Sequence, residues 1–150
     1  MRTSLLCMLI LLVVLCSCAA GKTPYTIDDA QILLEADLFI GDMGSVDRYI
    51  VSQLYGIDED TILDCTCYIA ANTASSADEL TIFILTDENG ARLAEEACQK
   101  RIKNQIEASR NYAPAAVSRL ESAVIRRIGN TVLFAVGDPE WLSKAVDGLH

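Results

Sequence analysis

The sequence of 150 residues contains a single histidine, His150, at its last position. A buried Ser-His-Asp or Cys-His arrangement needs a histidine held between its catalytic partners. Zinc sites also rely on histidine nitrogens where cysteines are too few to supply four ligands. The scarcity of histidine therefore argues against these hydrolase mechanisms, and we expect neither a metal site nor a cofactor.

Basic residues are also scarce, since 12 lysines and arginines face 21 aspartates and glutamates, giving a net charge of −9 at pH 7. Nucleic-acid binding relies on Lys and Arg to neutralise phosphates, so the composition argues against such a partner. Residues 24–91 hold fourteen acids and one base, whereas residues 92–127 hold eight bases and four acids. The basic segment indicates either a solvated helix face or a docking surface for an acidic partner or lipid headgroups.

The sequence lacks a hydrophobic run long enough to span a membrane. Its apolar run, residues 5–15, has about eleven residues, whereas a spanning helix needs roughly 20. A secretory signal instead has a basic residue, here Arg2, an apolar core of about 7–15 residues and small residues at the cleavage site. Residues 1–17 are therefore predicted to be an export signal.

The stretch LLVVLCSC, residues 11–18, contains the predicted cleavage site. Its last four residues resemble a bacterial lipobox, in which an aliphatic residue and two small residues precede the cysteine that becomes lipidated. Cys18 fits this role, whereas Cys16 would leave Leu15 at the last position before the cut. Two acyl chains form a stable anchor where a single chain is marginal. We expect a lipid on Cys18, a short tether over residues 18–25 and a position on the extracytoplasmic face of the cell membrane. The alternatives are an uncleaved N-terminus and a signal cut without lipid addition.

The remaining residues, 26–150, suit a single domain. Helical periodicity and capping signals predict five helices. The first starts at Thr26 with Asp29 as capping-box acid, and the third covers roughly residues 91–110. The second runs from Ser45 to a cap at Gly56, and its inward stripe is expected to contain Val46, Tyr49, Ile50 and Leu54. Two short helices begin near Pro114 and after Asp138-Pro139.

Period-two alternation predicts a half-buried strand over residues 61–71, with Leu63, Cys65, Cys67 and Ile69 on the inward face. Residues 80–86 are apolar or β-branched on both faces, as in a central strand. Gly129-Asn130 predicts a hairpin between residues 123–128 and 131–136, and residues 41–44 are assigned to a loop. The pattern predicts an α+β domain with a mainly antiparallel sheet of about four strands and helices packed on one face.

Several segments together carry a family resemblance: LYGID at 54–58, RIKNQIEASRNYAP at 101–114 and AVIRRIGNTVLFAV at 123–136. These segments resemble the bacterial lipoprotein family known as domain of unknown function 4358 (DUF4358). The likeness extends over about residues 26–147. It implies an exported, anchored protein without an assigned activity, so it supplies no catalytic residues.

The family pattern of a helical Arg, a Gln one turn later and a Tyr-x-Pro matches Arg101, Gln105, Tyr112 and Pro114. Arg101 and Gln105 share one face of the long predicted helix, and Tyr112 follows near its end. One interpretation is a buried set of donors that holds the loop between two helices. The other is a pocket for an anionic ligand, lined by Arg101, Gln105 and Tyr112.

Other side chains give weaker signals. Cys65, Cys67 and Cys98 remain after export, and they are interpreted as buried free thiols, with a Cys98 disulfide to Cys65 or Cys67 and redox catalysis as alternatives. Residues 58–60, Asp-Glu-Asp, are interpreted as a solvated turn, because the loop lacks the glycine and final glutamate of an EF-hand.

Two functional hypotheses follow. The first is a noncatalytic, membrane-anchored module that binds a protein, an envelope polymer or a small solute. The second is a small anchored hydrolase or thiol enzyme. The sequence leaves the ligand and the oligomeric state open.

Overall fold

The computed structural model describes residues 22–72, 76–111 and 113–149. The predicted signal at residues 1–17, the predicted lipidation site Cys18 and the candidate site residue Tyr112 lie outside these ranges. Within the described ranges, no helix combines the length and hydropathy needed to cross a membrane.

The described residues form an α+β fold, which confirms the predicted class. The helices and strands follow the predicted order, with one additional strand. In chain order they are α2 (Asp28–Leu34), β1 (Met43–Ser45), α3 (Arg48–Tyr55), the 3₁₀ turn η1 (Glu59–Thr61), β2 (Ile62–Ala70), β3 (Glu79–Leu85), α4 (Glu88–Ser109), α5 (Pro114–Glu121), β4 (Val124–Ile128), β5 (Thr131–Val136) and α6 (Leu142–Asp147).

The sheet has five strands in the order β1-β2-β3-β5-β4, and each neighbouring pair is antiparallel. The additional strand is β1, whose Met43 pairs with Ala70 at the end of β2. The sequence places this segment in a loop because three residues including a glycine are too short to show an alternating pattern. The predicted central strand is confirmed, since β3 lies between β2 and β5.

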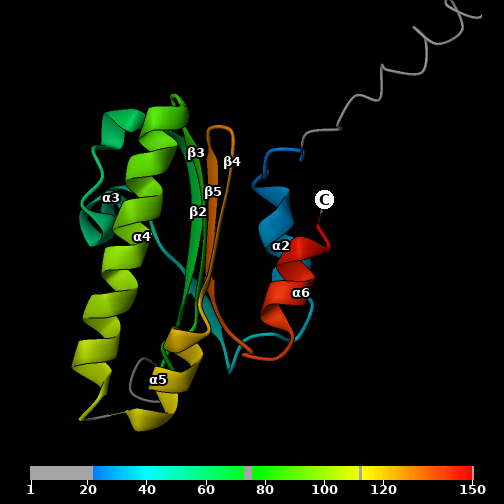
Figure 1. Cartoon of the computed structure of the whole chain (residues 1–150), viewed down its shortest axis with the longest axis vertical. Coiled ribbons are helices and arrows are strands. Elements are labelled where there is room, and N and C mark those ends of the chain that lie inside the picture. The colour runs from blue at the N-terminus through cyan, green and yellow to red at the C-terminus, as the bar shows by residue number, and fades with distance from the viewer. Residues whose placement is uncertain (1–21, 73–75, 112, 150) are drawn as a thin grey trace, which may run out of the picture.

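Helices cover both faces of the sheet, not one as predicted. Figure 1 shows α3, α4 and α5 on one side and α2 and α6 on the other. The central strands explain this arrangement, because they are apolar on both faces. In β3, Phe83 packs in the core beneath α3 and α4, whereas Leu80 and Ile82 pack in the core beneath α2 and α6. All three side chains are fully buried, so each face needs its own layer of helices.

Helix α3 exposes most of the side chains that the sequence predicted to face inward. The helix begins at Arg48, after an N-cap at Asp47, and ends at Gly56, whose φ of +64° fits the predicted left-handed cap. Its buried face instead carries Val51 and Tyr55. The helix starts three residues later than predicted, and the predicted start therefore did not identify the residues that face the sheet. The exposed residues are Tyr49, Ile50 and Leu54.

Strand β2 contains a register shift between Ile62 and Asp64 that the sequence pattern did not predict. Side chains alternate strictly along a regular strand, so one irregular residue reverses which face of the sheet the preceding side chains lie on. Ile62 is consequently buried, and Leu63, which was predicted to face inward, has 58% of its surface exposed. The rest of the predicted inward face holds, since Cys65, Cys67 and Ile69 pack in the core beneath α3 and α4.

The chain is already packed against the sheet at Tyr25, where the sequence predicted the end of a tether. The Tyr25 side chain is buried, and its backbone N–H donates to Thr131 Oγ1 at 3.0 Å. The Thr26 N–H donates to the Asp29 carboxylate at 2.7 Å, as expected for the capping-box acid, although α2 itself begins at Asp28.

Candidate functional site

A pocket of about 330 Å³ lies beside the C-terminal half of α4 and the start of α5. Its walls are largely apolar, and Arg101 and Gln105 supply its main polar groups. Both residues come from α4, four positions apart, so they lie on the same side of the helix. The apolar lining includes Leu54, Ile69, Ala77 and Ala116.

The guanidinium of Arg101 is paired with Glu79, the first residue of β3. Arg101 Nε lies 2.9 Å from both carboxylate oxygens, and Nη2 lies 2.8 Å from Glu79 Oε2. Glu79 is fully buried, whereas the Arg101 side chain is 15% exposed. Burial lowers the pKa of Arg101, but the hydrogen bonds and charge of Glu79 outweigh this effect and hold the pKa above its ordinary value. The arginine is therefore charged, and its charge is neutralised by Glu79.

Beneath this pair, a polar network continues into the core. Tyr55 donates its hydroxyl proton to Glu79 and lies 3.0 Å from Thr81 Oγ1, which in turn lies 3.2 Å from Cys67 Sγ. Arg101 also sits over the Tyr55 ring, with its guanidinium carbon 5.2 Å from the ring centroid. Burial and the nearby Glu79 charge raise the pKa of Tyr55 well above its ordinary value, so this phenol stays neutral.

Of the two polar atoms of the Gln105 side chain, the nitrogen has a hydrogen-bond partner among the described residues and the oxygen does not. Its side-chain nitrogen donates to Glu79 Oε2 at 3.4 Å. Its side-chain oxygen is buried and has no hydrogen-bond partner among the described residues. Buried polar atoms are nearly always hydrogen-bonded in folded proteins, so an exception calls for an explanation.

A second buried ion pair lies next to the first along the chain. Asp78 immediately precedes Glu79 and is fully buried, and its carboxylate accepts two hydrogen bonds of 2.6 Å from Arg119 of α5. Asp78 also accepts from the Ile40 N–H at 2.7 Å, and Arg119 donates to the Leu38 carbonyl at 3.2 Å. These contacts join α5 and the segment after α2 to the start of β3.

A smaller depression of about 200 Å³ lies between α3 and α4. It shares Leu54 and Arg101 with the larger pocket and is also lined by Lys100 and Asn104. Asn104 therefore lies beside the pocket that contains Gln105 but outside its lining, although the two amides are adjacent in sequence.

The three described cysteines are free. Burial raises the pKa of the Cys67 thiol to about 12 and that of Cys98 further, and it also raises the pKa of the half-buried Cys65. A thiolate is the reactive form of cysteine, and these thiols remain protonated near neutral pH. Across the described residues, no three His, Cys, Asp or Glu side chains are arranged to hold a metal ion.

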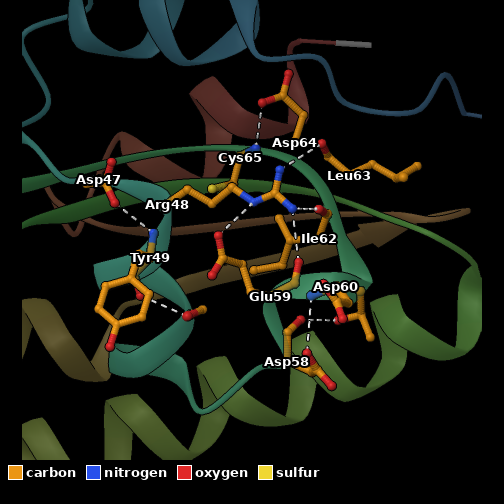
Figure 2. Close-up of polar contacts among 12 residues, drawn as sticks. Asp47, Arg48, Tyr49, Asp58, Glu59, Asp60, Ile62, Leu63, Asp64 and Cys65 are labelled. Atoms are coloured by element: carbon orange, nitrogen blue, oxygen red, sulfur yellow. Dashed lines mark hydrogen bonds and ion pairs between the residues drawn. The ribbon is translucent and has the colours of Figure 1, made fainter.

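Figure 2 shows a separate polar cluster around Arg48, at the start of α3. Its guanidinium donates to the backbone carbonyls of Glu59, Ile62 and Leu63, and its Nε lies 3.9 Å from the Glu59 carboxylate. The neighbouring acidic segment forms η1, where the Asp58 carboxylate accepts from the Asp60 N–H at 3.1 Å. These contacts attach α3 to the beginning of β2, and the acids form a capped turn.

The structure places Arg101 and Gln105 on the same side of α4, as their spacing predicted, and both residues line the pocket. Glu79, Asp78 and Arg119 were not identified from the sequence. A signal was present, because two adjacent acids precede a strand that is apolar on both faces, and the later basic segment supplies unmatched arginines. Two of these arginines, Arg101 and Arg119, carry the ion pairs to the acidic segment.

The profile of a family described as "Domain of unknown function (DUF4358)" matches residues 36–137, about two thirds of the chain. The matched range includes the pocket and both buried ion pairs. No curated protein and no solved structure matches the chain.

Proposed function

Because the chain belongs to the DUF4358 family, which has no assigned activity, we propose its function from its own residues. We propose that it is a lipid-anchored, noncatalytic binding module on the extracytoplasmic face of the cell membrane. The pocket beside α4 and α5 is the candidate binding site, and the ligand is a protein segment, an envelope polymer or a small solute.

The observation that carries the proposal is the neutralised charge in the pocket. Arg101 is the one charged residue among the described lining residues, and the buried Glu79 already pairs with it. General acid–base and nucleophilic catalysis need a titrating group or an activated nucleophile within reach of the substrate. A neutral, largely apolar pocket is better suited to hold a ligand than to transform one.

The thiol-enzyme alternative has less support. The raised pKa of Cys67 and Cys98 keeps both thiols protonated, and both side chains are buried away from solvent. Reactive cysteines lie instead in partly exposed, electropositive surroundings that lower the thiol pKa.

The anchor is supported by the sequence LLVVLCSC and is tested by mass spectrometry of the protein purified from its native membranes. We expect a chain that begins at Cys18 and carries a diacylglyceryl group on its sulfur. A matched Cys18→Ser variant is expected to lack this mass and to leave the membrane fraction or retain its signal. Recovery of native protein that still begins with Met1, or that has an unmodified Cys18, would refute the proposed anchor.

A further inference from the structure

We infer that the pocket beside α4 and α5 binds a small, neutral, largely apolar molecule that donates one hydrogen bond to Gln105. This inference rests on the proposed binding function and narrows its ligand class. It draws on the orientation of the Gln105 amide, the charge balance of the pocket and the composition of its walls.

The orientation of the Gln105 amide is fixed by its neighbour. A carboxylate paired with arginine can only accept hydrogen bonds, so the amide nitrogen, and not the oxygen, must face Glu79. The amide oxygen is consequently held away from Glu79, and it is the atom without a partner among the described residues. A buried acceptor in this state is stabilised by a ligand that brings an N–H or O–H donor.

The charge balance argues for a neutral ligand. Arg101 alone would attract an anion, but both oxygens of Glu79 lie within 2.9 Å of its Nε. An anionic ligand would have to compete with a fully buried carboxylate for the same guanidinium. A cationic ligand would find no acidic residue among the described residues that line the pocket. The ion pair therefore disfavours an anion, which was one of the two interpretations left open by the sequence, and the lack of acids among the described lining residues disfavours a cation.

The walls define the rest of the ligand. The apolar lining comes from Leu54, Ile69 and the four alanines Ala77, Ala108, Ala113 and Ala116. The pocket of about 330 Å³ lies near the lower end of the range for small-molecule sites, roughly 300–1,000 Å³. Removal of apolar surface from water supplies most of the affinity at such a site, whereas the few polar groups fix orientation. A compact ring with a single donor fits this description.

The test uses two probes of nearly equal shape, indole, which has one N–H donor, and benzofuran, which has none. The full-length protein is isotopically labelled, reconstituted in lipid nanodiscs and titrated with each probe while backbone amide resonances are followed by NMR. We expect indole to shift resonances of the pocket residues and to bind at least about fivefold more tightly than benzofuran, the ratio for one lost hydrogen bond to a buried acceptor. Empty nanodiscs correct for partitioning into lipid.

Two variants test whether Gln105 accepts the hydrogen bond from the indole N–H. Gln105→Leu is expected to abolish the preference for indole, whereas Asn104→Leu is expected to retain it, because Asn104 lines the neighbouring depression. The comparison of the two probes on the unaltered chain remains decisive if Gln105→Leu fails to fold. The inference is overturned if neither probe shifts pocket resonances, if both bind equally, or if Asn104→Leu removes the preference as well.

This experiment is separable from the test of the anchor. An unmodified Cys18 would refute the membrane attachment, and the same probe titration would then be carried out on the protein in solution without nanodiscs. A failed titration would refute the ligand class, whereas mass spectrometry of Cys18 would still report on the anchor.

Discussion

Replacing Arg101 with methionine is expected to destabilise the protein severely, because it leaves the carboxylate of Glu79 buried without its counter-ion. Methionine keeps an unbranched side chain of similar reach, so the change removes mainly the charge and its hydrogen bonds. Glu79 is fully buried and the Arg101 side chain is 15% exposed, so water cannot replace the lost partner.

The expected magnitude follows from this burial. Breaking a buried ion pair by removing one partner costs about 3–5 kcal/mol. A domain of this size has a total free energy of unfolding of about 5–15 kcal/mol, so the variant is expected to lose a large part of it. A matched control is Arg92→Met on the same helix, because Arg92 pairs with Glu96 at 2.5 Å but both side chains are about half exposed, 49% and 58%. Such surface pairs on a helix contribute about 0.3–0.5 kcal/mol.

The assay is urea-induced unfolding followed by circular dichroism, with the free energy extrapolated to water. A double variant, Arg101→Met with Glu79→Gln, is expected to recover much of the loss, because no ionised group is left unpaired and the Tyr55 hydroxyl keeps an acceptor. The reasoning is refuted if Arg101→Met costs no more than Arg92→Met, or if the double variant is no more stable than Arg101→Met alone.

Two other predictions concern strand β2. Burial raises the pKa of Cys67 to about 12, so its thiol should resist iodoacetamide at pH 8 until the chain is unfolded, as measured by mass spectrometry of timed samples. The folded state holds the thiol proton of Cys67 more tightly than the unfolded state does. The contribution of this thiol to the free energy of unfolding is therefore complete below about pH 9 and is lost as the pH rises toward 12. Cys67→Ala should make the urea midpoint of unfolding less sensitive to pH between these two values. Ile62→Ala should lower the free energy of unfolding by about 2–5 kcal/mol in urea titrations, whereas Leu63→Ala should change it by less than about 0.5 kcal/mol. A larger loss at Leu63 would contradict the irregular register at the start of β2.

Much of the fold was predictable because its long elements have clear periods. Strand β3, the hairpin of β4 and β5, and helix α4 each carry a pattern long enough to identify the element. Two of the failures share a physical cause, since β1 has three residues and α3 has eight. In such short segments tertiary packing, and not local pattern, decides which residues face the core. Residues 80–86 were recognised as apolar on both faces. The prediction nevertheless placed helices on one face, because it did not take into account that each apolar face needs its own layer of helices.

The candidate site was predictable only in part. Helical spacing placed Arg101 and Gln105 on one side of α4, because a separation of four residues is a local property. Their acceptor, Glu79, lies 22 residues before Arg101, and only the packing of α4 across β3 brings the two together. The charge asymmetry of the sequence indicated a solvated helix face or a docking surface, and it did not indicate that Arg101 and Arg119 pair with acids from the first half of the chain.

The adjacency of Asp78 and Glu79 constrains how this family can diversify by insertion and deletion. The two neighbouring carboxylates turn toward different arginines, one on α5 and one on α4. A single residue gained or lost between this dipeptide and the rest of β3 would turn Glu79 to the opposite face of the sheet, away from Arg101 on α4. We therefore expect relatives to have no insertion or deletion between this dipeptide and the rest of β3.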